Sequence, residues 1–329
     1  MSGLRCPDCG GSRLRALGRL PDVDMFAGAV LAAPQPGGEL LRSAACDLRF
    51  RHPHLGQDIY DRLYDNARID VWAAPETPQA LRRDQRLVLG LLAETFGARS
   101  GEHRAPKVLD FGCYGGGFLA ALPSPWRRFG IEVNAAAAAH AAAATGARVE
   151  RRLGAFAAGE CFDAIVAMDV IEHVPSPRAL VAALLERLAP DGLLVVTTGD
   201  GANPLWACVG ARWWYCFYPE HIAFLSQRWL AFHAALLGAD VLRVETFNYV
   251  DDVAGPAGAR QRQRQRRIRR WLEYALLPRR YARRPPGDGV PGIGLTRDHL
   301  LIALTRTGID SPPGSGASAV VAKRSSGFD

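Results

Sequence analysis

Short apolar runs alternate with helix-like segments along the middle of this chain of 329 residues. Segments that we predict as strands occur at residues 108–111, 129–133, 147–151, 162–169, 192–198, 241–246 and 299–305. Helical spacing or helix-forming composition occurs before and between them, at residues 79–93, 118–122, 135–144 and 176–188, and again from about residue 226. Strands that alternate with helices predict an α/β fold built on a parallel sheet.

Shifts in composition divide the chain around this alternating region. Residues 1–56 form a cysteine-containing module, residues 57–100 a helical lead-in, and residues 101–307 the α/β domain. Within that domain we expect an aromatic segment at 199–226 and a basic insertion at 250–290. The tail at 308–329 is rich in Ser, Gly, Pro and Ala, a composition that predicts disorder.

Overall composition is typical of a soluble globular protein, with 48% hydrophobic and 22% charged residues. We find no apolar run of about 18 residues, so no transmembrane helix is predicted. The N-terminus lacks the apolar core of a signal peptide. We therefore expect a cytoplasmic protein whose seven cysteines are reduced.

A glycine-rich turn follows the first predicted strand of the α/β domain. Asp110 ends the strand, and Gly112, Gly115, Gly116 and Gly117 lead into a helix, so backbone N–H groups are free to face a ligand. The spacing does not fit Gly-x-Gly-x-x-Gly, and no Gly-Lys-Ser/Thr follows, which excludes a phosphate P-loop. Glu132 closes the next strand, where a carboxylate suits ribose hydroxyls. The pattern predicts a nucleoside cofactor; a tight bend without a ligand is the alternative.

Further motifs stand at the ends of later strands. Phe162-Asp163 opens the fourth strand, Asp169-Val-Ile-Glu172-His173-Val-Pro follows it, and Leu188-Ala-Pro-Asp-Gly192 precedes the fifth. With this ordered set the chain resembles the class I S-adenosylmethionine-dependent methyltransferases of types 11, 12 and 23, a branch that includes quinone-biosynthesis O-methyltransferases. The resemblance covers roughly residues 100–305. It implies a Rossmann-like seven-strand class I methyltransferase sheet and transfer of the sulfonium methyl group of S-adenosylmethionine.

The resemblance also assigns cofactor-binding roles to individual residues. Glu132 would hold the ribose hydroxyls, Met168 and Asp169 would lie near the cofactor, and four residues would line its methionine part: Asp110, Gly112, Cys113 and Gly116. Tyr114 departs from the family, because it replaces the middle glycine of the loop. A paralogue that does not bind the cofactor is the alternative.

Three of the seven tryptophans lie in the aromatic segment 199–226, directly after the fifth strand. Ligands in open α/β sheets bind at the carboxyl ends of strands, so this segment is expected to roof a pocket for a small-molecule acceptor. A hydrophobic plug over the sheet is the alternative. Tyr218, Glu220 and His221 resemble the catalytic cluster of sugar C-methyltransferases, in which a Glu–His pair serves acid/base chemistry. These three are the predicted catalytic residues; the alternative for His221 is a histidine satisfied at a helix entry.

Asp169, Glu172 and His173 form a competing set at spacings that allow them to bind a divalent cation, with His221 as a further ligand. The alternative is that Glu172 and His173 only shape the pocket, as in most methyltransferases with Glu-His at this place.

Cys6-x-x-Cys9 has the spacing of a zinc knuckle, and Cys46 follows later. Sugar C-methyltransferases begin with a cysteine-bound zinc module, so the resemblance implies a structural zinc ion held by these three cysteines. The family's second Cys-x-x-Cys begins here with Ser43, which leaves His52 or His54 as a fourth ligand, or a site that has decayed.

The net charge of +7 is concentrated in one segment. Residues 260–284 hold eleven arginines and the single acid Glu273, which is +10 locally and leaves −3 for the remainder. If helical, the segment carries an apolar stripe of Ile268, Trp271, Leu272, Tyr274 and Ala275. It predicts peripheral membrane contact through 260–284 or a solvated insertion. Nucleic acid is disfavoured, because aromatic residues are too sparse for stacking on bases.

These features together predict a methyltransferase that acts on a small-molecule acceptor. A sugar, natural-product or cell-envelope precursor is the first expectation, and a quinone-type O-methyltransferase is the alternative. A third alternative, from a different class, is a non-catalytic protein of the same fold that binds a polyanion or a membrane through its arginine segment.

Overall fold

The computed structural model describes residues 3–26, 29–54, 60, 63–65, 81–97, 105–250, 257–277 and 294–307. Its longer helices are α3 (Arg83–Phe96), α4 (Gly117–Ala121), α5 (Ala135–Thr145), α6 (Pro177–Glu186), α7 (Pro204–Val209), α8 (Gln227–His233) and α9 (Ala257–Leu276). The strands of the N-terminal part are β1 (Leu14–Arg19), β2 (Val23–Phe26), β3 (Ala29–Gln35), β4 (Glu39–Ser43) and β5 (Arg49–His52). The later strands are β6 (Lys107–Phe111), β7 (Arg127–Ile131), β8 (Arg148–Glu150), β9 (Phe162–Met168), β10 (Leu188–Gly199), β11 (Ala223–Phe224), β12 (Ala239–Phe247) and β13 (His299–Arg306).

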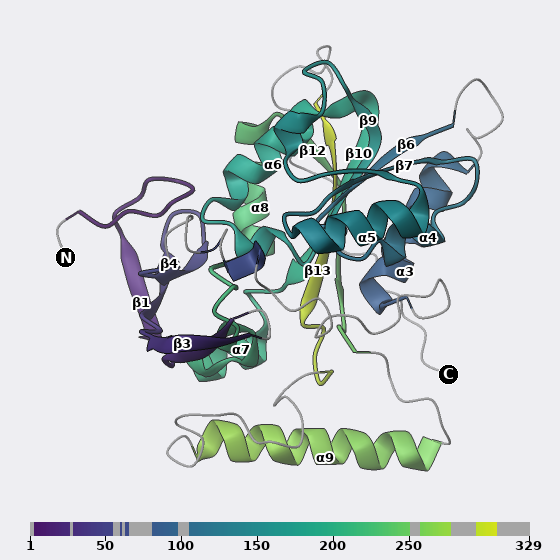
Figure 1. Cartoon of the computed structure of the whole chain (residues 1–329). Coiled ribbons are helices and arrows are strands. Elements are labelled where there is room, and N and C mark those ends of the chain that lie inside the picture. The colour runs from purple at the N-terminus through teal and green to yellow at the C-terminus, as the bar shows by residue number, and fades with distance from the viewer. Residues whose placement is uncertain are drawn as a thin grey trace.

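A seven-stranded sheet forms the centre of the molecule, in the order β12-β13-β10-β9-β6-β7-β8 (Figure 1). The pairs from β10 through to β8 are parallel, whereas β13 runs antiparallel to both of its neighbours. The order reverses beside β6, and the crevice at such a reversal is where ligands bind in open α/β sheets. The predicted Rossmann-like seven-strand sheet is confirmed.

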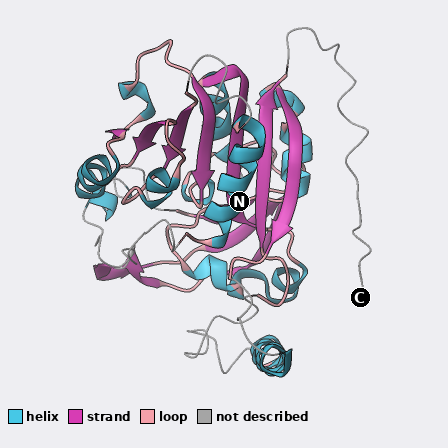
Figure 2. Cartoon of the chain, turned by 90° about the vertical axis from the view of Figure 1, so that its right-hand side faces the viewer, coloured by secondary structure: helices cyan, strands magenta, loops and turns pink. Residues whose placement is uncertain are grey.

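Alternate residues of each strand face two separate helical layers. Val108 lies in a cluster with residues of α3, α4 and α5, whereas Leu109 lies in a cluster with residues of α6 and α8. Helices are seen on both faces of the sheet in Figure 2. Because β9 is covered on both faces, it is an almost continuous apolar run, as is usual for a central parallel strand.

The aromatic segment contains more regular structure than its sequence pattern predicted. Helix α7 begins after Asn203, whose Oδ1 accepts hydrogen bonds from the backbone N–H groups of Leu205 and Trp206, and Pro204 takes the first helical position. Strand β10 likewise begins at Leu188 rather than residue 192, because Leu188 pairs with Phe162 ahead of an irregularity in the register.

The N-terminal part forms a four-stranded sheet in the order β1-β4-β5-β11. Its last strand, β11, comes from the aromatic segment, and Ala223 pairs with Phe50 of β5. Asp8 adds a second connection, because its carboxylate accepts hydrogen bonds from Ser176 Oγ at 2.7 Å and Trp229 Nε1 at 2.7 Å. The cysteine-containing module therefore packs directly against the α/β domain. The division of the chain at residues 56, 100 and 307 stays a prediction.

Several expectations fall partly or wholly outside the described residues. The tail 308–329 lies outside them, and the basic insertion is described only at 257–277, where α9 forms. Among the helices of the described residues, none is long and apolar enough to cross a membrane.

Candidate active site

The turn between β6 and α4 has a backbone that only particular residues can adopt. Gly112 and Gly116 have φ angles of 84° and 86°, in the left-handed region. A Cβ atom at Gly112 would lie 2.5 Å from Val170 Cγ2, so both the conformation and the close approach require glycine there. Tyr114 also has a positive φ, of 46°. The loop therefore keeps a glycine-like turn although tyrosine replaces the family's middle glycine.

Glu132, directly after β7, is tied to this turn. Its Oε2 accepts a hydrogen bond from the backbone N–H of Tyr114 at 3.0 Å, and its Oε1 accepts from that of Asn134 at 2.8 Å. Burial raises the pKa of Glu132, and the backbone N–H groups oppose that shift. Each carboxylate oxygen keeps a second lone pair that can accept a ribose hydroxyl. The turn and Glu132 therefore fit a nucleoside cofactor.

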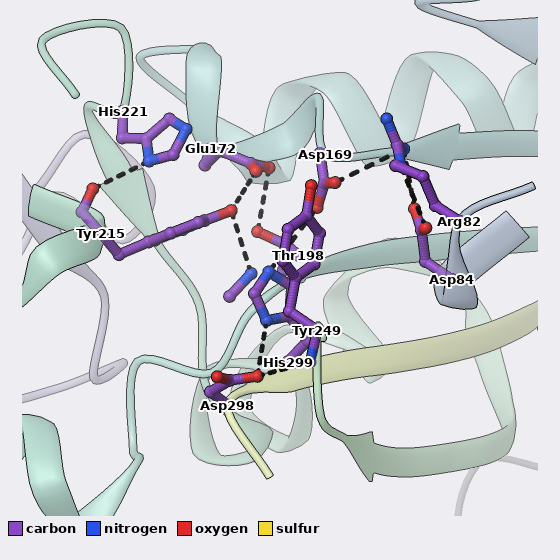
Figure 3. Close-up of polar contacts among 11 residues, drawn as sticks. Arg82, Asp84, Asp169, Glu172, Thr198, Tyr215, His221, Tyr249, Asp298 and His299 are labelled. Atoms are coloured by element: carbon purple, nitrogen blue, oxygen red, sulfur yellow. Dashed lines mark hydrogen bonds and ion pairs between the residues drawn. The ribbon is translucent and has the colours of Figure 1, made fainter. Parts of the chain in front are cut away.

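Asp169 follows β9 and also has a positive φ, of 52°. Its Oδ2 lies 3.5 Å from Arg82 Nη2, and its Oδ1 lies 3.9 Å from His299 Nε2 (Figure 3). Burial and the nearby Asp84 raise its pKa to about 6. His299 is in turn held by Asp298, whose Oδ1 lies 3.1 Å from His299 Nδ1. The sequence pattern gave no sign that Arg82 and His299 meet at Asp169.

Glu172 lies in the short turn Ile171–His173 after β9 and is 0% exposed. Its Oε1 accepts a hydrogen bond from the hydroxyl of Tyr215, and its Oε2 accepts one from Thr198 Oγ1 at 2.9 Å (Figure 3). Burial and the neighbouring Asp169 raise the pKa of Glu172 to about 8. A protonated Glu172 is thus the expected form at neutral pH when no cation is near.

The set of side chains that can bind a cation differs from the predicted one. Ligand atoms of Glu172, His173 and His221 lie within 4.8 Å of one another. Asp169, expected as the first ligand, is not in this group, because its left-handed backbone directs it to Arg82 and His299 instead. His221, expected as an additional ligand, takes its place.

His221 is held in one orientation by its backbone neighbour. Its Nδ1 lies 2.8 Å from the carbonyl oxygen of Tyr215. A carbonyl oxygen can only accept, so Nδ1 carries the proton and the lone pair of Nε2 is available. Burial lowers the pKa of His221, and the nearby His173 lowers it further. Burial also lowers the pKa of His173 to about 4, and its Nδ1 lies 2.6 Å from the Tyr64 hydroxyl.

The predicted catalytic residues lie together on the segment before β11. The ring of Tyr218 is 38% exposed, and its centroid lies 5.0 Å from that of His221. Glu220, which lies between Tyr218 and His221 in the sequence, is buried. Trp206, Trp213 and Trp214 are buried in a cluster with residues of the N-terminal sheet. These tryptophans form a hydrophobic base, while Tyr215, Tyr218 and His221 carry polar groups.

Arg51 on β5 fixes this segment from the N-terminal side. Its guanidinium is buried and donates hydrogen bonds to three carbonyl oxygens of the segment: Cys216 at 2.8 Å, Tyr218 at 3.3 Å and His221 at 3.4 Å. It also donates to Gly37 at 2.9 Å, and the Arg51 backbone N–H donates to Ile222 at 2.8 Å. The planar fork of arginine suits this set of acceptors, which a lysine ammonium cannot reach at once. Nothing in the local sequence around Arg51 indicated this role.

Comparison with known proteins agrees with this geometry. The methyltransferase domain family matches residues 80–244, half of the chain, and the chain belongs to this family. This membership confirms the methyltransferase family that the sequence motifs predicted.

Relatives and solved structures give the extent of the similarity. The ubiquinone biosynthesis O-methyltransferase of Cereibacter sphaeroides is 36% identical over 129 residues, 35% of this chain and 50% of that protein. That of Psychrobacter cryohalolentis is 38% identical over 125 residues, 32% and 47% of the two chains. The chain thus spans about half the length of the curated relatives it matches. Magnesium protoporphyrin IX methyltransferase from Synechocystis PCC 6803 has 10% identity and a TM-score of 0.46, over 78% of this chain and 99% of that one.

Replacing Arg51 by methionine is expected to loosen the segment that carries His221. The change leaves several buried carbonyl oxygens without donors, at about 1–3 kcal/mol for each unsatisfied group. Backbone amides of residues 216–224 should exchange with deuterium at least tenfold faster, while those of β6 and α4 stay unchanged, as followed by mass spectrometry. Arg15→Met, at an exposed site on β1, is the matched control. Equal exchange in the two variants would refute the role of Arg51.

Stability should depend on pH through Glu172. Its folded pKa of about 8 lies above the ordinary value of 4.5, so between these pH values the folded protein holds a proton that the unfolded chain has lost. The free energy of unfolding therefore falls as pH rises through this window. In urea titrations with a chelator present, Glu172→Gln should match the wild type near pH 4.5 and exceed it at pH 8 by roughly 2 kcal/mol or more.

Exposed Glu186→Gln is the control for that comparison and should show no such pH dependence. If Glu172→Gln is instead less stable at pH 8, and added divalent cations stabilise only the wild type, then Glu172 is an ionised cation ligand and the protonated form is wrong.

Proposed function

We propose that the acceptor is a small molecule that binds between the carboxyl ends of β9 and β10 and the segment 204–224. The observation that supports this most strongly is the fixed, neutral imidazole of His221, whose Nε2 lone pair is free beside the Glu172 cluster. A group of this kind is suited to remove a proton from an acceptor during methyl transfer.

The cofactor side of the proposal uses the residues that the family resemblance assigned. Asp110, Gly112, Cys113 and Gly116 would hold the methionine part, Glu132 the ribose, and Met168 and Asp169 would lie near the sulfonium. S-adenosylmethionine supplies an activated methyl group when bound. Its positive sulfonium would lie near the acidic Asp169, an arrangement that favours binding by charge.

The acceptor would receive the methyl group at an oxygen or a carbon atom, with S-adenosylhomocysteine as the neutral leaving group. Nε2 of His221 would take up the proton that this acceptor atom loses. Tyr215 and Arg51 do not take part in the transfer; they hold His221 in position, because in-line displacement depends on alignment.

The identity of the acceptor has two candidates. A sugar, natural-product or cell-envelope precursor agrees with the joint presence of the cysteine cluster and the Tyr218–Glu220–His221 segment. A quinone-type hydroxyl agrees with the names of the curated relatives, which this chain matches over about half their length. We place the first candidate ahead, because the two features that support it pack together in the structure through β5 and β11. Membership of the methyltransferase family favours an enzyme over the non-catalytic alternative.

Replacing His221 by glutamine is expected to lower the rate of methyl transfer by about 10²- to 10⁴-fold. The assay measures S-adenosylhomocysteine release with a panel of nucleotide sugars and polyprenylated phenols, so the wild type also identifies the acceptor class. Because the pKa of His221 is lowered, the wild-type rate should stay level from about pH 6.5 up to the pH near 8 at which Glu172 ionises, and it should fall in more acidic solution. His140→Gln, on the exposed side of α5, is the control. A His221→Gln variant with more than a tenth of the wild-type rate would overturn the assignment.

We propose in addition that Cys6, Cys9 and Cys46 bind a structural zinc ion. Their sulfur atoms lie within 4.8 Å of one another. Ser43 Oγ lies 3.4 Å from Cys9 Sγ, at the place of the family's fourth cysteine. His52 and His54, the expected fourth ligands, are not in the cluster formed by the described residues. The site therefore offers three thiolates and a hydroxyl-bearing side chain.

Metal analysis of the purified chain should find about one zinc ion per molecule. Cys9→Ser should lose it, whereas Ser43→Cys completes a four-thiolate set and should retain zinc against a chelator at least tenfold longer. Free-thiol titration and thermal unfolding supply readouts independent of activity. Fewer than about 0.1 zinc ions per chain in both the wild type and Ser43→Cys would rule out the site.

A further inference from the structure

Helix α9 carries exposed aliphatic side chains on one side. Ile268, Leu272 and Leu276 are 41%, 43% and 73% exposed, and Leu277 directly follows the helix with 48% exposed. Residues four apart lie on one face of an α-helix, so the first three form a continuous stripe, here called the outer stripe. A shallow groove along it is lined by Gln265, Arg269 and Glu273 together with the leucines.

The opposite side of α9 is attached to the protein. Tyr274 is buried, its hydroxyl donates a hydrogen bond to the carbonyl oxygen of Arg212, and Arg212 Nη1 donates to the carbonyl oxygen of Tyr274 at 3.0 Å. Tyr274 lies about 120° around the helix from Ile268, at 100° per residue. The outer stripe therefore points away from the molecule. Figures 1 and 2 show α9 at the periphery, beyond the ends of the central strands.

Positive charge surrounds the outer stripe. The helix contains seven arginines and one acid, Glu273, and most of the arginines are exposed. Arg264 continues the row of the stripe one turn before Ile268, and Arg262 and Arg269 lie on one flank, by the same helical spacing. Three aliphatic side chains flanked by arginines match a surface that is negatively charged outside and apolar just beneath.

We propose that α9 lies on an anionic lipid surface, with the outer stripe inserted among the acyl chains and the flanking arginines on the phosphates. This does not depend on the identity of the acceptor. A nucleic acid would use the arginines but leave the aliphatic side chains in water. Of the aromatic side chains of the described helix, Tyr274 is buried and Trp271 is only partly exposed, which leaves little surface for stacking on bases. A second copy of the chain would bring two arginine-rich faces together, which electrostatic repulsion opposes.

The experiment is sedimentation of the full-length protein with vesicles of phosphatidylcholine, either alone or with about 30% phosphatidylglycerol. The wild type should bind the anionic vesicles at least tenfold more tightly, and less tightly as salt rises. Changing Ile268, Leu272 and Leu276 together to glutamine should weaken that binding at least tenfold. The matched control changes Leu236 and Leu242 to glutamine, because these leucines are 67% and 55% exposed elsewhere, and it should bind like the wild type.

Three outcomes would overturn the proposal. The first is no preference of the wild type for anionic vesicles. The second is equal vesicle binding by the wild type and the triple variant, which would mean that the stripe does not insert. The third is a dimer that the triple variant converts to a monomer, which would assign the stripe to a second copy. Unchanged S-adenosylhomocysteine binding by the variants shows that they are folded.

Discussion

The buried carboxyl group of Glu172 joins the central sheet to the aromatic segment 199–226. Thr198 of β10 and Tyr215 of the aromatic segment both donate hydrogen bonds to it, and the Glu172 carbonyl oxygen accepts one from the backbone N–H of Ile222. A polar group at 0% exposure is costly unless its hydrogen bonds are satisfied. The segment that carries His221 must therefore pack where it does, and Arg51 holds the same segment from the other side.

This arrangement separates two acid/base environments that lie close together. Asp169 has Arg82 and His299 nearby, whereas Glu172 is surrounded by hydroxyl groups and neutral histidines. The first suits an ionised carboxylate near a positive sulfonium, and the second favours neutral groups that exchange protons with an acceptor. Under the proposed function, the first environment would lie beside the charged cofactor and the second would keep a neutral base nearby.

Much of the fold was predictable from sequence because the central strands are covered on both faces and read as apolar runs, as in β6 and β9. The turn at Gly112–Gly116 and Glu132 were also predictable, since strand ends bring them together.

Arg51, Tyr215 and His299 were missed because their contacts join residues distant in sequence; Arg51 and His221 are 170 positions apart. Asp169 was grouped with Glu172 and His173 on spacing alone, but its positive φ turns it away from them. The residue beside the three cysteines is Ser43 and not a histidine, because β4 places Ser43 next to Cys9.

We propose that the turn after β6 and Glu132 hold the nucleoside of S-adenosylmethionine, although Tyr114 stands in that turn. Calorimetric titration with S-adenosylhomocysteine tests this most directly. We expect micromolar binding by the wild type, binding at least tenfold weaker by Glu132→Gln, and unchanged binding by Glu94→Gln, at an exposed site on α3. No measurable heat from the wild type at high micromolar ligand, or equal affinity of Glu132→Gln and the wild type, would contradict it.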